Sequence, residues 1–449
     1  MIQHRPIMDL AIKPDLEAAV ITKLTRRLLP FLFLLYIVAY LDRINVGFAA
    51  LQMQKQFGFS DAVYGLGAGV FFAGYFFFQV PSNLVLAQVG PRRWIAALMV
   101  VWGAISSAMV FISGPRSFYA LRFLLGAAEA GFFPGMILYL KNWFPARARA
   151  RAVALFMTAG PIAGVMGGPI SGALLGLHSR HISGWQWLFL IEGLPAVLLG
   201  IVVFVFLTDY PEAAAWLNDE ERARLIEVLS REQESHPGPA PREVISAFAN
   251  WQIWLLIIVY FGATTCAYGL SLWLPNLIHN VSKVGNFGVG LLSTIPYLAT
   301  AVAMVLVGMH SDRTGERRWH LALSAFAGTI GLWCAAFASS TVPQIVFLSL
   351  ALLSAFSMMG PFWATSTSLL SRTAAAAGIA LINSFGNLGG FFGPYMIGVV
   401  RTATGDFGGG LVIAGAMLAV SGGLAIAVRE TKPTLGSQPE LGSKLTNVR

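Results

Sequence analysis

Long apolar stretches separated by short polar segments recur along the whole chain of 449 residues. About 20 apolar residues cross the hydrocarbon core of a bilayer as a helix, and twelve stretches fall near that length. These predicted spans are residues 28–50, 63–88, 93–113, 117–140, 151–176, 185–207, 250–275, 287–309, 320–338, 343–369, 374–400 and 408–428. A transmembrane barrel would instead show short segments of alternating hydrophobicity. The pattern therefore predicts an all-α polytopic membrane protein with twelve transmembrane helices.

One long hydrophilic connection follows the sixth predicted span and divides the chain in two. Within it, Asn218 followed by Glu221 is typical of a capped helix start, and a Pro-rich segment at 236–241 ends that helix. We therefore predict a tail at 1–27, a six-helix bundle at 28–207, a linker with an amphipathic helix at 208–249, a second bundle at 250–428 and a tail at 429–449.

The two halves of the chain resemble each other at an offset of 225 residues. The loop Gly90-Pro-Arg-Arg-Trp94 recurs as Gly315-Glu-Arg-Arg-Trp319. Further matches at the same offset pair Gly164 with Gly389, Gly168 with Gly393, Pro169 with Pro394 and Arg147 with Arg372. Parallel repeats of six helices are a transporter architecture, with the binding site between the repeats near the middle of the membrane. The sequence thus predicts two pseudo-symmetric six-helix bundles.

The composition agrees with a membrane protein and sets its orientation. Residues are 56% hydrophobic and only 11% charged, whereas about a quarter are charged in ordinary soluble domains. If the N-terminus is cytoplasmic, 23 of the 30 Lys and Arg residues lie on the inner side, 5 on the outer side and 2 within spans. This asymmetry places both termini in the cytoplasm. The net charge of +9 is spread over loops, so we expect no nucleic-acid partner.

Four charged residues interrupt the predicted spans. Asp42 and Arg43 lie in the first span, and Arg122 and Glu129 lie in the fourth, two helical turns or about 10 Å apart. A charge near the middle of a membrane costs on the order of 2.5–3.5 kcal/mol on insertion scales, so such residues usually mark a pathway or site. We expect a formally neutral cluster of the four. The alternatives are an interfacial helix end at Asp42 and a purely structural charge network.

This cluster has a possible chemistry. Burial and a nearby arginine act in opposite directions on a carboxylate's affinity for a proton, so Asp42 and Glu129 are predicted proton-coupling residues. The planar guanidinium of Arg43 suits two-pronged binding of a carboxylate. We therefore expect an organic anion as substrate and protons as the coupling ion, with no other cofactor.

Other polar and aromatic residues within the spans extend the predicted site. Glu192, in the sixth span, is assigned with Arg122 to a charge network. The predicted substrate-binding residues besides Arg43 are Tyr75, Tyr268, Trp363, Asn383 and Asn387. Tyr268 is the repeat mate of Arg43, although each of the five, taken alone, is of a kind that is more often a packed core residue or an interfacial anchor than a ligand. The sequence contains no metal-ligand cluster and no nucleotide motif, and its hydroxyl residues have no intramembrane histidine nearby in sequence, so we expect neither a metal site nor an enzyme.

Several motifs together resemble a known transporter family. The segment Gly308-Met-His-Ser-Asp312-Arg313-Thr-Gly315-Glu-Arg317-Arg318 is similar to the loop signature of the major facilitator superfamily. Four further motifs, taken with it, resemble the anion:cation symporter family and its bacterial branch of tartrate transporter-like, phthalate and hydroxyphenylacetate permeases. They are Tyr-Leu-Asp42-Arg43-Ile-Asn45, Gln79-Val-Pro81-Ser82-Asn83, Arg122-x6-Glu129-Ala-Gly-x2-Pro134 and Trp185-Gln-Trp187-x4-Glu192-Gly.

The resemblance implies proton-coupled uptake of a small organic anion across the bacterial inner membrane. It implies that Asp42 and Glu129 carry protons, that Arg43 holds the substrate carboxylate, and that Tyr75 and Asn383 donate hydrogen bonds to it. It also implies a gating role for the loop residues Asp312, Arg313 and Arg317. We expect a monomer whose partners are the lipid bilayer and the substrate. Exchange of organic anions and a membrane sensor with a transporter fold are the alternatives.

Overall fold

The computed structural model describes residues 14–234, 249–369 and 375–428, which are helical and contain no strand. The helices of the first half are α1 (Pro14–Phe57), α2 (Asp61–Val89), α3 (Pro91–Ala108), α4 (Pro115–Glu129), α5 (Phe132–Trp143), α6 (Ala146–Met157), α7 (Ala159–Leu174), α8 (Gly184–Phe206) and α9 (Asp219–Glu234). Those of the second half are α11 (Trp251–Ser282), α12 (Asn286–Thr314), α13 (Arg318–Phe337), α14 (Thr341–Ser357), α15 (Met359–Leu369), α16 (Ala375–Asn387), α17 (Gly389–Thr404) and α18 (Gly408–Ala427).

Four predicted spans are broken rather than continuous. The fourth, fifth, tenth and eleventh spans consist of α4 with α5, α6 with α7, α14 with α15, and α16 with α17. Pro134, Pro161 and Pro361 each stand third in the second helix of their pair. There the missing N–H costs little, because the first N–H groups of a helix lack an intrahelical partner anyway. In the sequence, these prolines are the feature from which three of the four breaks could be predicted.

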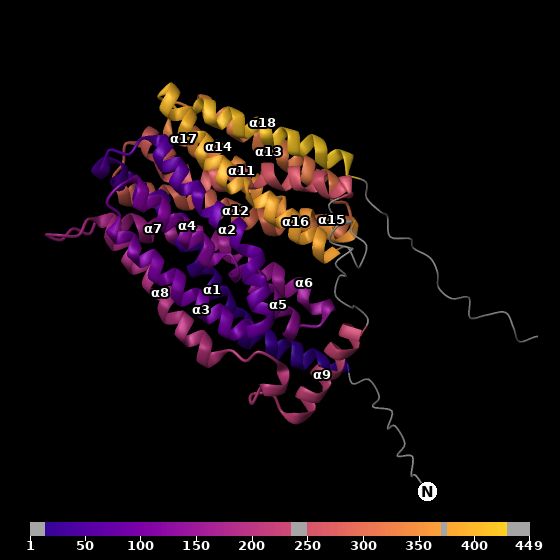
Figure 1. Ribbon diagram of the computed structural model, residues 1–449. Coiled ribbons are helices and arrows are strands. Elements are labelled where there is room, and N and C mark those ends of the chain that lie inside the picture. Colours follow the sequence, from indigo (N-terminus) through magenta and orange to yellow (C-terminus); the bar gives the residue numbers. More distant parts are fainter. Residues whose placement is uncertain (1–13, 235–248, 370–374, 429–449) are drawn as a thin grey trace, which may run out of the picture.

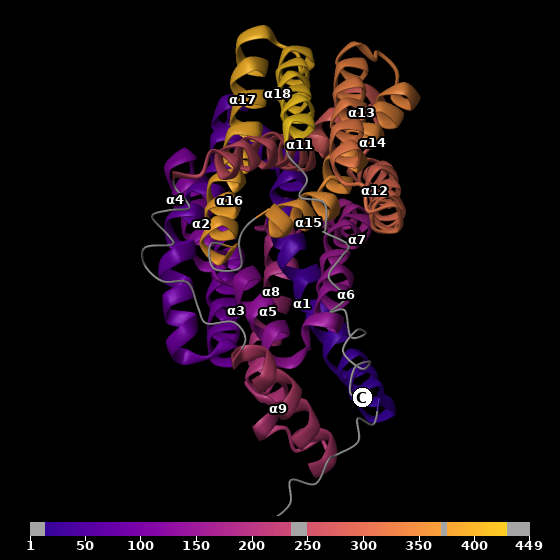
Figure 2. The same cartoon turned by 90° about the vertical axis from the view of Figure 1, so that its right-hand side faces the viewer.

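Eleven segments of the described residues are long and apolar enough to cross a membrane. They correspond to eleven of the twelve predicted spans, and α16 with α17 supplies the remaining one. The first helix is longer than predicted, because α1 begins at Pro14 and not near residue 28. Figures 1 and 2 show two groups of helices side by side, one formed by the first half of the chain and one by the second.

Helix α9 packs against the N-terminal part of α1 in the first bundle. Its start has the predicted capping box, because Asn218 Oδ1 accepts from the Glu221 N–H at 2.7 Å and Glu221 Oε2 accepts from the Asn218 N–H at 3.0 Å. Lys23 of α1 donates to Glu221 at 2.6 Å and lowers the pKa of that carboxyl. The bond therefore contributes its full stabilisation above the ordinary pKa of a glutamate, and that contribution is lost as the pH falls through the lowered pKa.

The two bundles meet along two helix pairs related by the repeat. Helix α7 crosses α12 where Gly168 faces Gly290, and α17 crosses α2 where Pro394 and Gly398 face Gly65. Gly65 and Gly290 are 225 residues apart, which is the offset found in the sequence. A Cβ atom added at Gly65 would lie 2.5 Å from the Pro394 carbonyl oxygen, and one at Gly290 would lie 2.2 Å from that of Gly168. Glycine at these positions lets the backbones of opposite bundles touch.

We expect Gly290→Ala to reduce transport about tenfold or more while leaving the protein folded. The added methyl group would meet backbone atoms of α7, which cannot move aside as a flexible side chain does. The bundles would then be unable to close on each other at this crossing. Uptake into proteoliposomes measures the effect, and gel filtration in detergent checks the fold. Gly423→Ala is the matched control, since a Cβ at Gly423 meets no atom within 4 Å. Equal uptake by the two variants would contradict this account.

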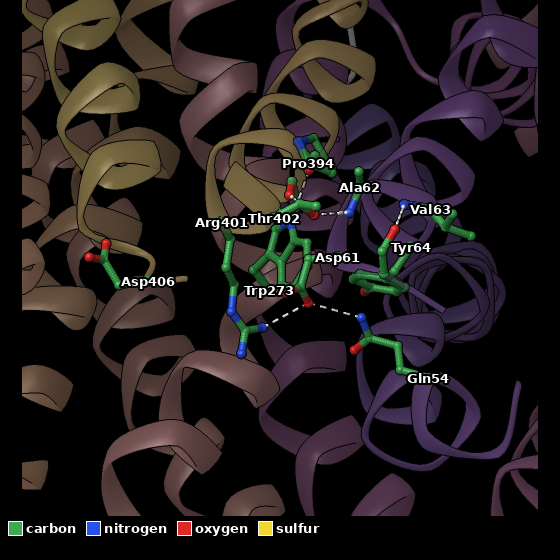
Figure 3. Close-up of polar contacts among 12 residues, drawn as sticks. Gln54, Asp61, Ala62, Val63, Tyr64, Trp273, Pro394, Arg401, Thr402 and Asp406 are labelled. Atoms are coloured by element: carbon green, nitrogen blue, oxygen red, sulfur yellow. Dashed lines mark hydrogen bonds and ion pairs between the residues drawn. The ribbon is translucent and has the colours of Figure 1, made fainter. Parts of the chain in front are cut away.

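One end of the molecule is held closed by polar contacts between bundles. We call the end that carries Lys55, Asp61 and Arg401 the outer end, following the predicted orientation. There Arg401 Nη1 lies 3.0 Å from Asp61 Oδ1, and the Ala62 N–H donates to Thr402 at 2.8 Å (Figure 3). Towards the other end, the hydrogen bonds between described residues of the two bundles include only the one from Ser384 to Gln79, at 3.0 Å. The structure is therefore closed at the outer end.

We expect Asp61→Asn to increase the population of molecules open at the outer end by about two- to fivefold. Its ion pair with Arg401 is partly exposed, and such pairs contribute about 0.2–1 kcal/mol. Distances between spin labels at Ser60→Cys and Thr404→Cys, both exposed, measure the population. Arg116→Gln removes an exposed charge at the same end and should change nothing. An unchanged distance distribution in Asp61→Asn would show that the ion pair does not hold the bundles together.

Candidate functional site

A cavity lies between the bundles, next to the breaks in the spans. Its wall contains all six residues predicted to bind substrate. The lining residues are Tyr36, Tyr40, Arg43, Phe72, Tyr75, Phe133, Met157, Gly160, Pro161, Tyr260, Tyr268, Met304, Phe356, Met359, Trp363, Asn383 and Asn387.

The sequence analysis missed the remaining aromatic residues of this wall. Tyr36 and Tyr40 were detectable, because they precede Arg43 by seven and three residues and so share its helix face. Tyr36 also stacks on Phe156 of the first bundle, with ring centroids 4.6 Å apart. Tyr260, on the opposite wall, stacks on Phe362 at 5.0 Å. Aromatic side chains from both bundles therefore enclose the few polar groups.

Arg43 is the centre of the polar contacts at the cavity. Its Nη2 lies 2.8 Å from Glu129 Oε2, and its Nη1 donates to the Tyr268 hydroxyl at 3.2 Å. The guanidinium carbon lies 5.3 Å from the ring centroid of Phe71 and 5.6 Å from that of Tyr75, within the range of cation–π attraction. Because Glu129 belongs to the first bundle and Tyr268 to the second, Arg43 connects the two across the cavity. The repeat mates Arg43 and Tyr268 are in direct contact.

Glu129 is buried and only partly satisfied. One carboxylate oxygen takes the bond from Arg43, while Oε1 has no hydrogen-bond partner among the described residues. Glu129 is 1% exposed and is the last residue of α4, directly before the break at Ala130. A buried carboxylate with one free oxygen can accept a proton there without losing its place beside Arg43. Glu129 therefore has a free oxygen that could take a proton, and its role in proton coupling stays a prediction.

Asp42 does not contact the cavity. It is completely buried and accepts hydrogen bonds from Ser106 at 2.7 Å, Trp102 at 3.2 Å and Asn45 at 3.4 Å. None of the ion pairs between described residues involves it. Neighbouring positions on a helix do not face each other, so Asp42 points into the first bundle while Arg43 points into the cavity.

Arg122 also lies apart from the carboxylates. It donates to the carbonyl oxygens of Gly67 and Ala68, each at 3.3 Å, and its guanidinium carbon is 4.9 Å from the Phe71 ring centroid. Two helical turns separate it from Glu129, too far for a direct pair. The four charges therefore do not form one network of direct contacts, although they lie close enough to interact electrostatically. The structure contains one pair, Arg43 with Glu129, and two charges held by polar groups.

The remaining predicted residues occupy three different places. Glu192 accepts from Ser171 at 2.7 Å inside the first bundle and does not reach the cavity. Asn387 donates to Asn383 Oδ1 at 3.0 Å, one turn away on α16, so the two amides form one polar strip on the cavity wall. Trp363 covers the cavity from α15. The loop residues Asp312, Arg313 and Arg317 lie at the junction of α12 and α13, where Asp312 and Arg313 are exposed.

The predicted loop motif contains a tight turn between α12 and α13. Gly315 has a φ of +66°, in the left-handed region that favours glycine, and it ends α12. Ser311 donates to the Glu316 carbonyl at 2.9 Å across this turn. The motif therefore fixes a tight connection between two helices of the second bundle at the inner end.

Two repeated helix bundles of membrane-spanning length, with a cavity of aromatic and a few polar side chains between them, are the architecture of a polytopic membrane transporter. Comparison with known proteins assigns the family. The chain belongs to the Major Facilitator Superfamily, whose family model matches residues 32–394 and 283–448. This confirms the predicted fold class and the superfamily resemblance.

Named relatives and solved structures agree with this assignment. The chain is 48% identical to a "Putative tartrate transporter" of Agrobacterium vitis, over 94% of this chain and 98% of the relative. It is 41% identical to a "Quinolone resistance transporter" of Acinetobacter baumannii, over 88% and 92%, and 40% identical to the "Inner membrane transport protein RhmT" of Escherichia coli, over 91% and 94%. The fold resembles that of a bacterial homologue of the human lysosomal transporter Spinster in an inward-facing conformation, with a TM-score of 0.74, 16% identity, and coverage of 93% of this chain and 97% of the other.

Proposed function

We propose that this protein takes up a small organic carboxylate together with protons, by alternating access. The observation that carries the proposal is the ion pair between Arg43, which lines the central cavity, and the buried Glu129. Arginine stays protonated and binds carboxylates through paired donors. In the absence of substrate, the Glu129 carboxylate takes one of the guanidinium donors that a substrate carboxylate would need.

Charge balance gives the coupling mechanism. The empty site is neutral, because Arg43 is paired with the Glu129 carboxylate. Proton binding alone would leave Arg43 uncompensated, and substrate binding alone would leave an extra negative charge. Removing one partner of a buried pair costs about 3–5 kcal/mol, so the site favours binding of both together. Asp42 stays a predicted second proton site, although it cannot act by releasing an arginine.

The closed outer end supports an alternating-access cycle. With the outer ends joined by Asp61 and Arg401, the cavity would open only towards the inner side, where the described bundles share a single hydrogen bond, between Gln79 and Ser384. Rocking of the bundles at the glycine crossings would then expose the cavity to the outer side. We place the protein in the bacterial inner membrane as a monomer with cytoplasmic termini, in line with the Lys and Arg distribution.

The names of the relatives support an acid as substrate. Relatives named as tartrate transporters share nearly half of the residues over almost the whole chain. The cavity contains two amide side chains beside Arg43, which can hydrogen-bond a carboxylate or hydroxyl group. Gly160 leaves the fifth span without a polar group at the cavity, which favours an acid with few hydroxyl groups.

Uptake by purified protein in proteoliposomes tests the proposal. Radiolabelled tartrate, phthalate, hydroxyphenylacetate and a sugar acid would each be offered with and without an inward proton gradient. We expect at least one of them to accumulate only when the gradient is present. Uptake of a carboxylate that ignores the gradient would contradict proton coupling.

A second candidate is exchange or export of aromatic organic anions. The aromatic wall of the cavity and the similarity to a protein named as a quinolone resistance transporter favour it. This activity would appear as counterflow, in which labelled acid outside exchanges with unlabelled acid inside without a gradient. Counterflow without any gradient-driven accumulation would favour exchange over symport.

A further inference from the structure

A second cavity lies at the outer end, separate from the central one. It has an empty volume of about 640 Å³ and is lined by Ala50, Leu51, Gln54, Lys55, Phe59, Asp61, Asn276, His279, Asn280 and Arg401. We call it the outer vestibule. It shares no lining residue with the central cavity, and it is formed by both bundles.

Cationic and donor groups predominate in the outer vestibule. Lys55 and Arg401 carry two positive charges against the single negative charge of Asp61. Arg401 uses Nη1 for Asp61 (Figure 3). Its guanidinium lies over the Phe407 ring, 3.9 Å from the ring centroid, which fixes it at the cavity wall. Asp61 already accepts a second bond, from Gln54 at 3.1 Å. The acid can therefore leave Arg401 and keep a partner.

An unused donor points to a ligand that accepts hydrogen bonds. Asn276 is 9% exposed, and its Nδ2 is buried without a partner among the described residues. The Nδ1 of His279, one turn further along α11, is also buried and without such a partner. A buried donor without an acceptor costs about 1–3 kcal/mol. An anion that accepts from Asn276 would remove that cost and gain the attraction of Lys55 and Arg401.

We propose that the outer vestibule binds a small oxyanion, such as a carboxylate, before the central site does. The anion would take Arg401 from Asp61 and so release the ion pair that joins the outer ends of α2 and α17. Binding at the vestibule would thus favour opening towards the side from which the anion comes. The proposal rests on the proposed function only for the identity of the anion. The site itself does not require proton coupling.

Binding to purified protein tests the vestibule independently of the central site. Tartrate and sulfate would be titrated into Arg43→Ala, which lacks the central arginine, and into the double variant that carries both Arg43→Ala and Lys55→Gln. We expect Arg43→Ala to keep one weak binding event. In the double variant, the affinity of this event should fall at least about fivefold. Arg116→Gln, the matched loss of an exposed outer charge, should leave it unchanged. Asn276→Ala gives a second, uncharged test of the same site.

Spin-label distances between Ser60→Cys and Thr404→Cys supply the structural readout. In the Arg43→Ala background, either anion should increase the open population at the outer end, and Lys55→Gln should remove that response. Absence of tartrate and sulfate binding in Arg43→Ala would overturn the proposal. Lys55 and Arg401 would then serve only to offset the partial negative charge at the carbonyl ends of their helices. If no carboxylate were transported but this Lys55-dependent binding were found, the proposed function would fail and the vestibule would stand.

Discussion

Arg43→Ala is expected to abolish carboxylate transport and to remove strong carboxylate binding at the central cavity. Arg43 is the one arginine on the wall of the central cavity among the described residues. Its two recorded side-chain hydrogen bonds go to Glu129 and to Tyr268. Charged hydrogen bonds contribute about 1.5–3 kcal/mol each, so loss of the guanidinium should weaken carboxylate binding by about 100-fold or more. The variant also removes the partner that makes the buried Glu129 carboxylate tolerable.

A thermal-shift titration with the transported acid measures this effect directly, because a ligand that binds only the folded state raises the melting temperature. Arg43→Lys separates charge from geometry. It keeps the positive charge but lacks the planar fork, so it should bind weakly, between wild type and Arg43→Ala. Arg116→Gln controls for general loss of positive charge. A full thermal shift in Arg43→Ala would place the carboxylate elsewhere and remove the main support for the proposed function.

The architecture was predictable because it depends on patterns that lie within the sequence. Spans follow from runs of apolar residues, and the two bundles follow from the repeat at 225 residues. The six predicted substrate-binding residues reached one cavity because a polar or aromatic group inside an apolar span is costly unless it faces the interior. The contact of Arg43 with its repeat mate Tyr268 follows from the same symmetry, which brings equivalent positions together near the axis.

The details that failed depend on contacts between distant segments. Adjacent positions such as Asp42 and Arg43 look like one charged site in sequence, but the helix turns them towards different neighbours. Only the packing of α3 shows that Ser106 and Trp102 supply hydrogen bonds to Asp42. The outer vestibule escaped notice for the same reason. Lys55, Asn276 and Arg401 lie in three separate segments, and no local pattern marks any of them.

The second large effect is expected for Glu129→Gln, which should separate binding from proton coupling. The amide resembles a protonated glutamate in shape and charge, and it cannot release a proton. Arg43 would then lack its ionic partner permanently, so the variant should bind the carboxylate at least as tightly as wild type. Accumulation driven by a proton gradient should fall to background. Residue 129 could no longer lose a proton, so no negative charge would form beside Arg43 to displace the bound anion. Counterflow at equal pH should persist, since exchange requires no change in protonation.

Asp42→Asn is the matched comparison, because it makes the same change one residue from Arg43 but outside the cavity. Its hydrogen bonds come from Ser106, Trp102 and Asn45, so carboxylate affinity should stay close to that of wild type. If Asp42 carries a second proton, gradient-driven accumulation should fall without the tighter binding expected of Glu129→Gln. Measurement of tartrate affinity, accumulation and counterflow for both variants separates the two roles. Tighter binding in Asp42→Asn but not in Glu129→Gln would mean that Asp42, and not the ion pair of Arg43 with Glu129, controls access to Arg43.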